Sequence, residues 1–267
     1  MKRSLLLTLG LALVGGLAVL MLVSLFYTPY EPNAMKIAHR LEAPSAAHWL
    51  GTDNFGRDVL SRVMVGTQTA FLVGAASVAI GAAGGLAVGT IAGYAGRWAD
   101  ELLMRATDAL LAFPGILLAL LLVSVFKPSL SQTVLAIGIL FVPSFARVIR
   151  SGVLQQREAE YVRAVRGFGA GHMNLLFVQI LPNIASSIVT TAALSFSTAI
   201  LIEAALSYLG LGVQPPDPSW GRMLNESQTY LAKAPWFTLA PGLLITATVL
   251  GFNLLSDGIR DALDKRV

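Results

Sequence analysis

The sequence contains no cysteine and little charge. Without cysteine, disulfides, thiol catalysis and cysteine-based zinc or iron–sulfur sites are excluded. Charged residues make up 13% of the chain, which is about half of the roughly 25% found in an ordinary soluble domain. The composition therefore argues against a soluble globular protein, because too few charges are present to cover a surface that faces water.

The sequence also lacks a phosphate-binding loop and a basic patch. A Walker A loop places glycine directly before lysine, but the five lysines follow Met1, Met35, Phe126, Ala232 and Asp264. The net charge is +4, yet the 19 basic residues stand singly between apolar runs, which argues against nucleic-acid binding. We therefore expect neither ATP hydrolysis nor nucleic-acid binding by this chain.

Long apolar runs are abundant: 55% of the residues are apolar, and the mean hydropathy is +0.69. A helix needs about 20 predominantly apolar residues to cross a bilayer. The sequence predicts six such spans, at residues 5–27, 71–94, 102–126, 133–148, 183–206 and 237–255. No small-x-small cleavage site follows the first run, so we interpret it as an uncleaved span rather than a signal peptide.

The distribution of the basic residues predicts the orientation. Placing the amino terminus inside puts twelve of the 19 lysines and arginines in cytoplasmic segments and seven outside. Cytoplasmic loops retain lysine and arginine, so both termini are expected in the cytoplasm. We expect an all-α polytopic membrane protein in three parts: a first span with an outer loop at 1–66, a five-helix core at 67–256, and a cytoplasmic tail at 257–267.

The most informative polar segment is the cytoplasmic loop at residues 151–182. On a helix, its apolar side is formed by Tyr161, Val162, Val165 and Phe168, and its polar side by Glu160, Arg163 and Arg166. Gly167 and Gly169 then break the helix, and Pro182 starts the next span. The pattern predicts a short helix, a glycine turn and a second short helix.

Pattern alone leaves two interpretations of this loop. It is either an amphipathic helix lying among lipid headgroups or an element that docks on another protein. A DNA-binding helix-turn-helix is disfavoured, because both flanks run directly into the membrane.

The same loop resembles the EAA motif of bacterial ABC-importer permeases, which ends with a glycine and, further on, Leu-Pro. When the two are aligned on Leu181-Pro182, the motif glycine falls on Gly169 and its first alanine on Ala164. Arg163 stands where the motif often has glutamate, and Gln179 where it often has isoleucine.

The resemblance extends over nearly the whole chain. The stretch PSAAHWLGTDNFGRDVLSR, at 44–62, is similar to the GTDxxGRDxxSR block of peptide and nickel permeases of the dipeptide-transporter C-subunit type. Residues 104–114, 203–224 and 253–264 match further blocks of this family, in the same order. The outer-loop residues that carry the match are Gly51, Thr52, Asp53, Gly56, Arg57, Asp58, Ser61 and Arg62.

The resemblance implies a type I ABC-importer permease fold in a bacterial inner membrane. In such importers two homologous permeases form the path, two ATPase subunits hold ATP and magnesium, and an external binding protein delivers the substrate. The chain itself is then not an enzyme and holds no cofactor. The implied substrate is a di- or oligopeptide, with nickel or a metal chelate as the alternative.

A different class, the ion-coupled secondary transporter, is the competing hypothesis. It would need an internal inverted repeat or a buried ion relay, and neither is visible in the sequence.

The resemblance also implies that the loop at 151–182 is a coupling helix that docks in a groove of an ATPase subunit. The expected coupling residues are Glu160, Tyr161, Arg163, Ala164, Arg166, Gly167, Phe168, Gly169, Leu181 and Pro182.

Four glycines and one acid stand out inside the predicted spans. Gly81, Gly85, Gly89 and Gly93 recur every four positions, a spacing that permits close approach of membrane helices. We favour helix packing over a role in lining the path. Glu203 should face the bundle or the cavity, because a charge in the bilayer is costly. We favour a structural hydrogen bond near an outer gate over proton coupling.

Two charge pairs have helical spacing and are predicted to form ion pairs along one helix. Asp58 and Arg62 would pair in an interfacial helix that leads into the second span, and contact with the binding protein is the functional alternative. Arg105 and Asp108 would pair at the start of the third span.

The remaining candidate features are two prolines and three histidines. Pro114 and Pro143 are predicted to kink the third and fourth spans. His39, His48 and His172 are dispersed along the sequence, so no metal site is predicted, because a ligand set needs converging donors.

Overall fold

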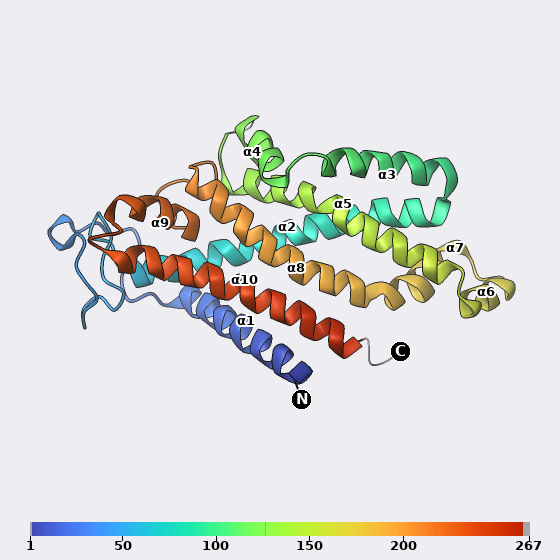
Figure 1. Ribbon diagram of the computed structural model, residues 1–267, viewed down its shortest axis with the longest axis horizontal. Coiled ribbons are helices and arrows are strands. Elements are labelled where there is room, and N and C mark those ends of the chain that lie inside the picture. Colours follow the sequence, from blue (N-terminus) through green and yellow to red (C-terminus); the bar gives the residue numbers. More distant parts are fainter. Residues whose placement is uncertain (1, 126, 264–267) are drawn as a thin grey trace.

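The long helices of the computed structural model lie side by side (Figure 1). The structure describes residues 2–125 and 127–263, and the regular elements of this part of the chain are helices. The long ones are α1 (Lys2–Phe26), α2 (Val59–Ala95), α5 (Leu130–Arg157), α8 (Leu181–Tyr208) and α10 (Pro235–Leu263). The last position of the predicted third span, 126, and residues 264–267 of the predicted tail lie outside the described residues.

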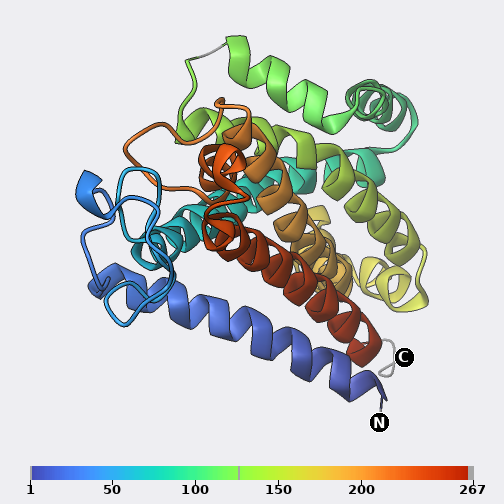
Figure 2. The same cartoon turned by 60° about the vertical axis from the view of Figure 1, so that its left-hand side comes forward.

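Short elements stand at both ends of this bundle (Figures 1 and 2). At one end, called the α9 end below, lie the 3₁₀ turn η1 (Ile37–His39), α9 (Trp220–Ser227) and the 3₁₀ turn η3 (Gln228–Tyr230). At the other, called the α6 end below, lie α6 (Glu160–Gly167), α7 (His172–Asn174) and the π-helix η2 (Leu175–Ile180). Two further helices, α3 (Arg97–Leu111) and α4 (Gly115–Val125), join α2 to α5.

The membrane spans agree with the predicted number when α3 and α4 are counted together. By length and composition, five helical segments can cross a membrane: Leu6–Phe26, Val59–Ala95, Leu130–Arg157, His172–Tyr208 and Pro235–Ala262. The pair α3 and α4 passes the same test only jointly and is bent by 88° at a short break.

The predicted third span is thus two helices at a steep angle rather than one kinked helix. Pro114 stands at this break, directly before α4. Proline lacks an N–H group and disfavours helical backbone at the residue before it, so α3 cannot continue through Phe113. Pro143, in contrast, lies inside the continuous helix α5.

Ion pairs hold α3 against α5. Arg150 forms a bidentate pair with Asp100, and the Nη2 atom of Arg147 lies 2.6 Å from the Oδ1 atom of Asp108. The predicted pair between Arg105 and Asp108 is wrong: Arg105 bonds to a glutamate one turn earlier on its own helix. Asp108 is therefore available to α5, which presents arginines at this level.

The glycine stripe of α2 faces α5 at close range. A methyl group added at Gly81 would lie 2.5 Å from the Cβ atom of Phe141, and one at Gly93 would lie 2.9 Å from the Cβ atom of Val153. A methyl group at Gly85 would collide with Phe145. The four glycines, Gly81, Gly85, Gly89 and Gly93, are all buried. Because membrane helices associate by close packing, this contact fixes α2 against α5.

Helix α1 packs along α10 (Figure 2), and here too glycines allow the two backbones to approach closely. Gly10 of α1 meets the backbone of Leu255, and Gly258 of α10 meets the backbone of Leu7. The first span is therefore attached to the bundle mainly through the last one.

The start of α2 differs from the predicted interfacial helix. Asp58 caps α2 by accepting a hydrogen bond from the N–H group of Ser61 at 2.7 Å, as acidic residues at this position commonly do. The helix then runs without interruption from Val59 to Ala95. The residues expected to form an interfacial helix are the first turns of α2, and a domain boundary at 66 would fall within that helix.

The α2–α5 contact predicts a selective sensitivity to added volume. Gly85→Ala should lower the free energy of unfolding by about 1–3 kcal/mol, because a methyl group there overpacks the interface with Phe145. Thermal unfolding of the purified protein in detergent measures this change. The matched control is Gly16→Ala on α1, where nothing lies within 4 Å of the added methyl group. Equal losses of stability in the two variants would contradict the close contact.

Candidate functional site

The segment between α5 and α8 protrudes at the α6 end of the bundle (Figure 1). Helix α6 packs through Val162, which is 3% exposed and belongs to the main hydrophobic core. The side chains and backbone that face outward include Glu160, Arg163, Ala164, Arg166, Gly167 and Phe168. The predicted polar side of this helix thus stands free on the surface.

Phe168 departs from the predicted apolar side. Helix α6 ends at Gly167, so the next residue no longer follows the helical face that Val162 defines. Phe168 is 91% exposed. A large aromatic side chain in this position adds apolar surface to an otherwise charged protrusion, which is typical of an element that docks on a partner.

The turn after α6 depends on Gly169. Its φ angle is +86°, a left-handed conformation that costs a residue with a side chain about 1–2 kcal/mol. The N–H group of Gly169 donates to the carbonyl oxygen of Arg166 at 3.0 Å, and that of Ala170 donates to Val165 at 3.3 Å. These bonds satisfy the last carbonyl groups of α6 and reverse the chain toward α7.

Tyr161 ties α6 to both neighbouring long helices. Its hydroxyl group donates to the Oε1 atom of Gln156 in α5 at 2.6 Å and accepts from the Nδ2 atom of Asn183 in α8 at 3.0 Å. These bonds connect α6 to the end of α5 and to the start of α8.

The second half of the segment returns the chain to the bundle. Leu175, Leu176 and Ile180 of η2 are buried, and Leu181 packs against the same core. Pro182 lies in the first turn of α8, where its missing N–H group leaves no hydrogen bond unmade. The π-helical form of η2 carries no signal in the sequence that we can identify.

One ion pair within this segment involves Arg163. Its Nη2 atom lies 2.8 Å from the Oε2 atom of Glu158. The hydrogen bond from Arg163 holds the pKa of Glu158 below its usual value. Both side chains are more than half exposed, so solvent screens the pair and its contribution to stability is small.

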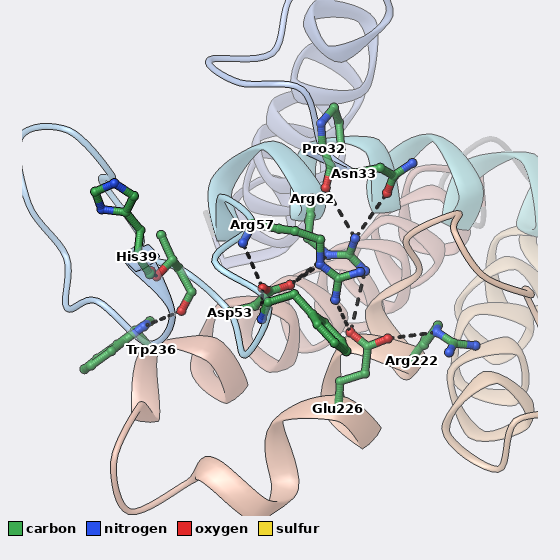
Figure 3. Close-up of polar contacts among 11 residues, drawn as sticks. Pro32, Asn33, His39, Asp53, Arg57, Arg62, Arg222, Glu226 and Trp236 are labelled. Carbon is green, nitrogen blue, oxygen red and sulfur yellow. Dashed lines mark hydrogen bonds and ion pairs between the residues drawn. The ribbon is translucent and has the colours of Figure 1, made fainter. Parts of the chain in front are cut away.

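A network of buried charges occupies the α9 end of the bundle (Figure 3). Asp53 pairs with Arg57, whose Nη2 atom lies 2.8 Å from the Oε2 atom of Glu226 in α9. Glu226 also pairs with Arg222 at 2.9 Å. Arg62 of α2 lies 3.6 Å from both Asp53 and Glu226 and is 1% exposed.

This network explains why the predicted pair between Asp58 and Arg62 is wrong. Asp58 accepts hydrogen bonds from the N–H and hydroxyl groups of Ser61, both at 2.7 Å. It also lies 2.8 Å from the Nδ1 atom of His48. With Asp58 engaged in this way, Arg62 turns to the carboxylates of Asp53 and Glu226 (Figure 3).

The glycines and the threonine of the same block position the loop. Gly56 has a φ angle of +73°, and a methyl group on it would collide with the carbonyl oxygen of Lys36. The carbonyl oxygen of Thr52 accepts a hydrogen bond from the indole Nε1 atom of Trp236 at 3.3 Å. The buried Gly51 accepts at its carbonyl oxygen from the N–H group of Val59.

The motif contains three members of this network, Asp53, Arg57 and Arg62, but the sequence predicts none of its ion pairs. The block Gly51–Arg62 was visible as a motif, but its partners Arg222, Glu226 and Trp236 lie far away in the sequence. The spacing of Arg222 and Glu226, four residues apart on a short helix, is the one local signal that was available.

A comparison with known protein families matches residues 85–267. The matched family is described as the binding-protein-dependent transport system inner membrane component. This chain belongs to that family. It is therefore the permease component of a binding-protein-dependent ABC importer and a multi-pass inner-membrane protein.

Individual relatives match the permease over nearly its whole length. The dipeptide transport system permease protein DppC of Alkalihalophilus pseudofirmus is 42% identical over 267 residues, 100% of this chain and 88% of the relative. The glutathione transport system permease protein GsiD of Pectobacterium atrosepticum is 42% identical over 262 residues, covering 96% and 87%. The di/tripeptide transport system permease protein DppC of Pseudomonas aeruginosa is 42% identical over 266 residues, covering 95% and 88%.

Glu203 lies inside the permease bundle, where it is 1% exposed. The hydroxyl group of Ser207 donates to its Oε1 atom at 2.7 Å, and the same hydroxyl oxygen accepts from the N–H group of Val213 at 3.1 Å. The acid is thus hydrogen-bonded, and through Ser207 it anchors the loop that follows α8.

The histidines of the permease remain apart. His39 lies 2.7 Å from Glu42, His48 bonds to Asp58, and the Nδ1 atom of His172 lies 2.6 Å from the hydroxyl oxygen of Tyr94. Within residues 2–125 and 127–263, no three histidine, aspartate or glutamate side chains lie close enough together to hold a metal ion.

The buried network of the permease predicts a large effect of removing its central carboxylate. Glu226→Gln should lower the free energy of unfolding by about 3–5 kcal/mol, because it leaves Arg57 and Arg62 buried with less negative charge. The midpoint of thermal unfolding in detergent measures the loss.

The matched control for this variant is Glu101→Gln. Glu101 pairs with Arg105 at 2.8 Å, but both side chains are more than 60% exposed, so its loss should change stability by less than about 1 kcal/mol. If the two variants unfolded at the same temperature, the network would not stabilise the α9 end.

Proposed function

We propose that this permease forms half of the translocation path of an ATP-driven importer of di- or oligopeptides. The observation that carries the proposal is the 42% identity, over 95–100% of the chain, to permeases named for dipeptides, di/tripeptides and glutathione. Nickel or a metal chelate is the alternative substrate, and no relative named above is a nickel permease.

The proposed partners follow from the family. A second homologous permease completes the path, two ATPase subunits drive it, and an external binding protein delivers the peptide. ATP and magnesium bind to the ATPase subunits, and this chain holds no cofactor. Its contribution is mechanical: it lines the path and transmits the motion of the ATPase subunits to the spans.

We further propose that α6 is the element that contacts an ATPase subunit. It protrudes from the bundle and carries the charged residues Arg163 and Arg166, and the exposed aromatic residue Phe168 follows it directly. A short helix of this kind can insert into a groove of a partner. Tyr161 and Asn183 then link the displaced helix to the spans.

The orientation is proposed on the same basis. If α6 lies in the cytoplasm, α5 ends there and α8 begins there. The amino-terminal end of α1 and the carboxyl-terminal end of α10 then lie in the cytoplasm too. The network around Arg62 lies on the outer side of the membrane, within reach of a binding protein. The permease would be placed in the cytoplasmic membrane of a bacterium with both termini inside.

Reconstitution tests the proposed function. The permease, co-purified with its partner subunits and placed in vesicles with ATP inside and loaded binding protein outside, should accumulate a radiolabelled dipeptide. Replacing the Walker lysine of the ATPase subunits should abolish this uptake. Uptake by the permease alone, driven by a proton gradient, would instead establish a secondary transporter. Accumulation of radioactive nickel, without accumulation of the dipeptide, would favour the alternative substrate.

The role of α6 predicts a defect at its glycine turn. Gly169→Leu should leave membrane insertion intact but weaken the association with the ATPase subunits, because a side chain disfavours the φ angle of +86°. Co-purification of the ATPase subunits and uptake measure the defect.

The control for this variant is Gly171→Leu. Gly171 precedes α7 with a φ angle of −69°, and nothing lies within 4 Å of an added Cβ atom there or at Gly169. Normal ATPase association and transport in Gly169→Leu would refute the assignment of α6.

A further inference from the structure

A groove between three long helices opens in the α6 half of the bundle. Its volume is about 590 Å³, and its lining comes from α5, α8 and α10. Helix α8 packs against the other two and lies between them (Figures 1 and 2). The lining segments are the part of α5 that leads to α6, the part of α8 that follows η2, and the last turns of α10. The groove thus lies next to the proposed coupling element.

The lining is too polar to face lipid. Arg147, Ser151 and Gln155 of α5 recur at helical spacing and are exposed. Arg260 of α10 adds a second guanidinium group. A charged side chain in the bilayer centre costs about 2.5–3.5 kcal/mol, so such residues face water or a polar partner. The core of a stable protein interface is depleted of charge, which favours an aqueous cavity.

The two arginines are available to a ligand. The side chains of Arg147 and its partner Asp108 are 52% and 61% exposed, and an exposed pair contributes little and exchanges readily. Within residues 2–125 and 127–263, Arg260 has no carboxylate within 4.0 Å, and it is exposed. Both guanidinium groups can therefore bind a carboxylate by paired hydrogen bonds.

The hydroxyl groups of α8 complement these cations. Thr190 donates its hydroxyl hydrogen to the carbonyl oxygen of Ser186 at 2.8 Å, and Thr191 donates to that of Ser187 at 2.7 Å. With their hydrogens used in this way, the threonine oxygens keep free lone pairs and act as acceptors. They can bind the amide or ammonium groups of a ligand whose carboxylate lies on the arginines.

A second cavity lies further along two of these helices, α5 and α8. That cavity has a volume of about 390 Å³ and lies below the break between α3 and α4. Ser144 and Thr198 line it, one turn along α5 from Arg147 and one turn along α8 from Leu194, which line the groove. Most of its other lining residues are apolar, so the two cavities differ in polarity.

We propose that the polar groove is a relay site for the carboxylate end of a peptide as it leaves the path. Arg260 and Arg147 are its anion-binding side chains, and the hydroxyl groups of Thr190 and Thr191 accept hydrogen bonds from the peptide. The volume lies within the about 300–1,000 Å³ typical of small-ligand sites. The inference rests on the proposed transport of peptides and adds the residues that receive the substrate.

The test uses the complete importer in vesicles, with binding protein outside and ATP inside. The permease is wild type, Arg260→Gln, Arg260→Lys or the control Arg105→Gln, which removes another exposed charge from α3, outside the groove. The measurement is the number of radiolabelled dipeptide molecules taken up per ATP hydrolysed. Vesicles are prepared from phosphatidylcholine alone and from phosphatidylcholine with phosphatidylglycerol.

We expect Arg260→Gln to lower this ratio about tenfold, as the loss of one charge-assisted hydrogen bond implies. Arg260→Lys keeps the charge but loses the paired hydrogen bonds, so its ratio should lie between those of Arg260→Gln and the wild type. Arg105→Gln should match the wild type. The binding protein is unchanged in all samples, so a difference reports on the permease.

Three results would overturn the inference while wild-type peptide uptake, and with it the proposed function, stands. Arg260→Gln and Arg105→Gln could give the same uptake ratio, which would show that Arg260 does not bind the peptide. The defect could occur only with phosphatidylglycerol, which would identify a lipid phosphate as the occupant. Arg260→Gln could lose its partner subunits on purification, which would make the groove a docking surface. Absence of dipeptide uptake by the wild type would instead overturn the proposed function itself.

Discussion

The close contact between α2 and α5 is the constraint on which the rest of the structure depends. Inside a membrane, lipid is as apolar as leucine, so helices gain little from burying apolar side chains against one another. They associate where backbones approach closely, and the four glycines of α2 provide such a surface. Helix α5 in turn leads into α6, carries Arg147 of the groove and pairs with α3 through Arg150. The positions of α6 and of the α5 side of the groove thus depend on this interface.

The buried charges at the α9 end have a different role. Burying ion pairs is rarely the best way to gain stability, because desolvation offsets much of the attraction. Such pairs can instead select one arrangement among several, since any other leaves charges unpaired. Here Glu226 joins the loop before α2 to α9, segments that a long stretch of chain separates. The network therefore fixes the surface that would face a binding protein.

Much of the fold could be predicted from the sequence, because its signals are local. Hydropathy found the spans, glycine at position 169 marked the end of the α6 region, and glycine spacing marked the packing side of α2. The unpredicted features depend on tertiary contacts. The sequence around Arg62 offers Asp58 as a partner, and only the folded chain brings Glu226 closer. The hydroxyl groups of Thr190 and Thr191 are hidden in a span that reads as apolar.

An interface built on glycine has no side-chain rotamers on one of its surfaces, and therefore no soft degree of freedom there. Close-packed contacts of this kind transmit force rather than absorb it. We therefore expect α2 and α5 to move together as one rigid body during transport.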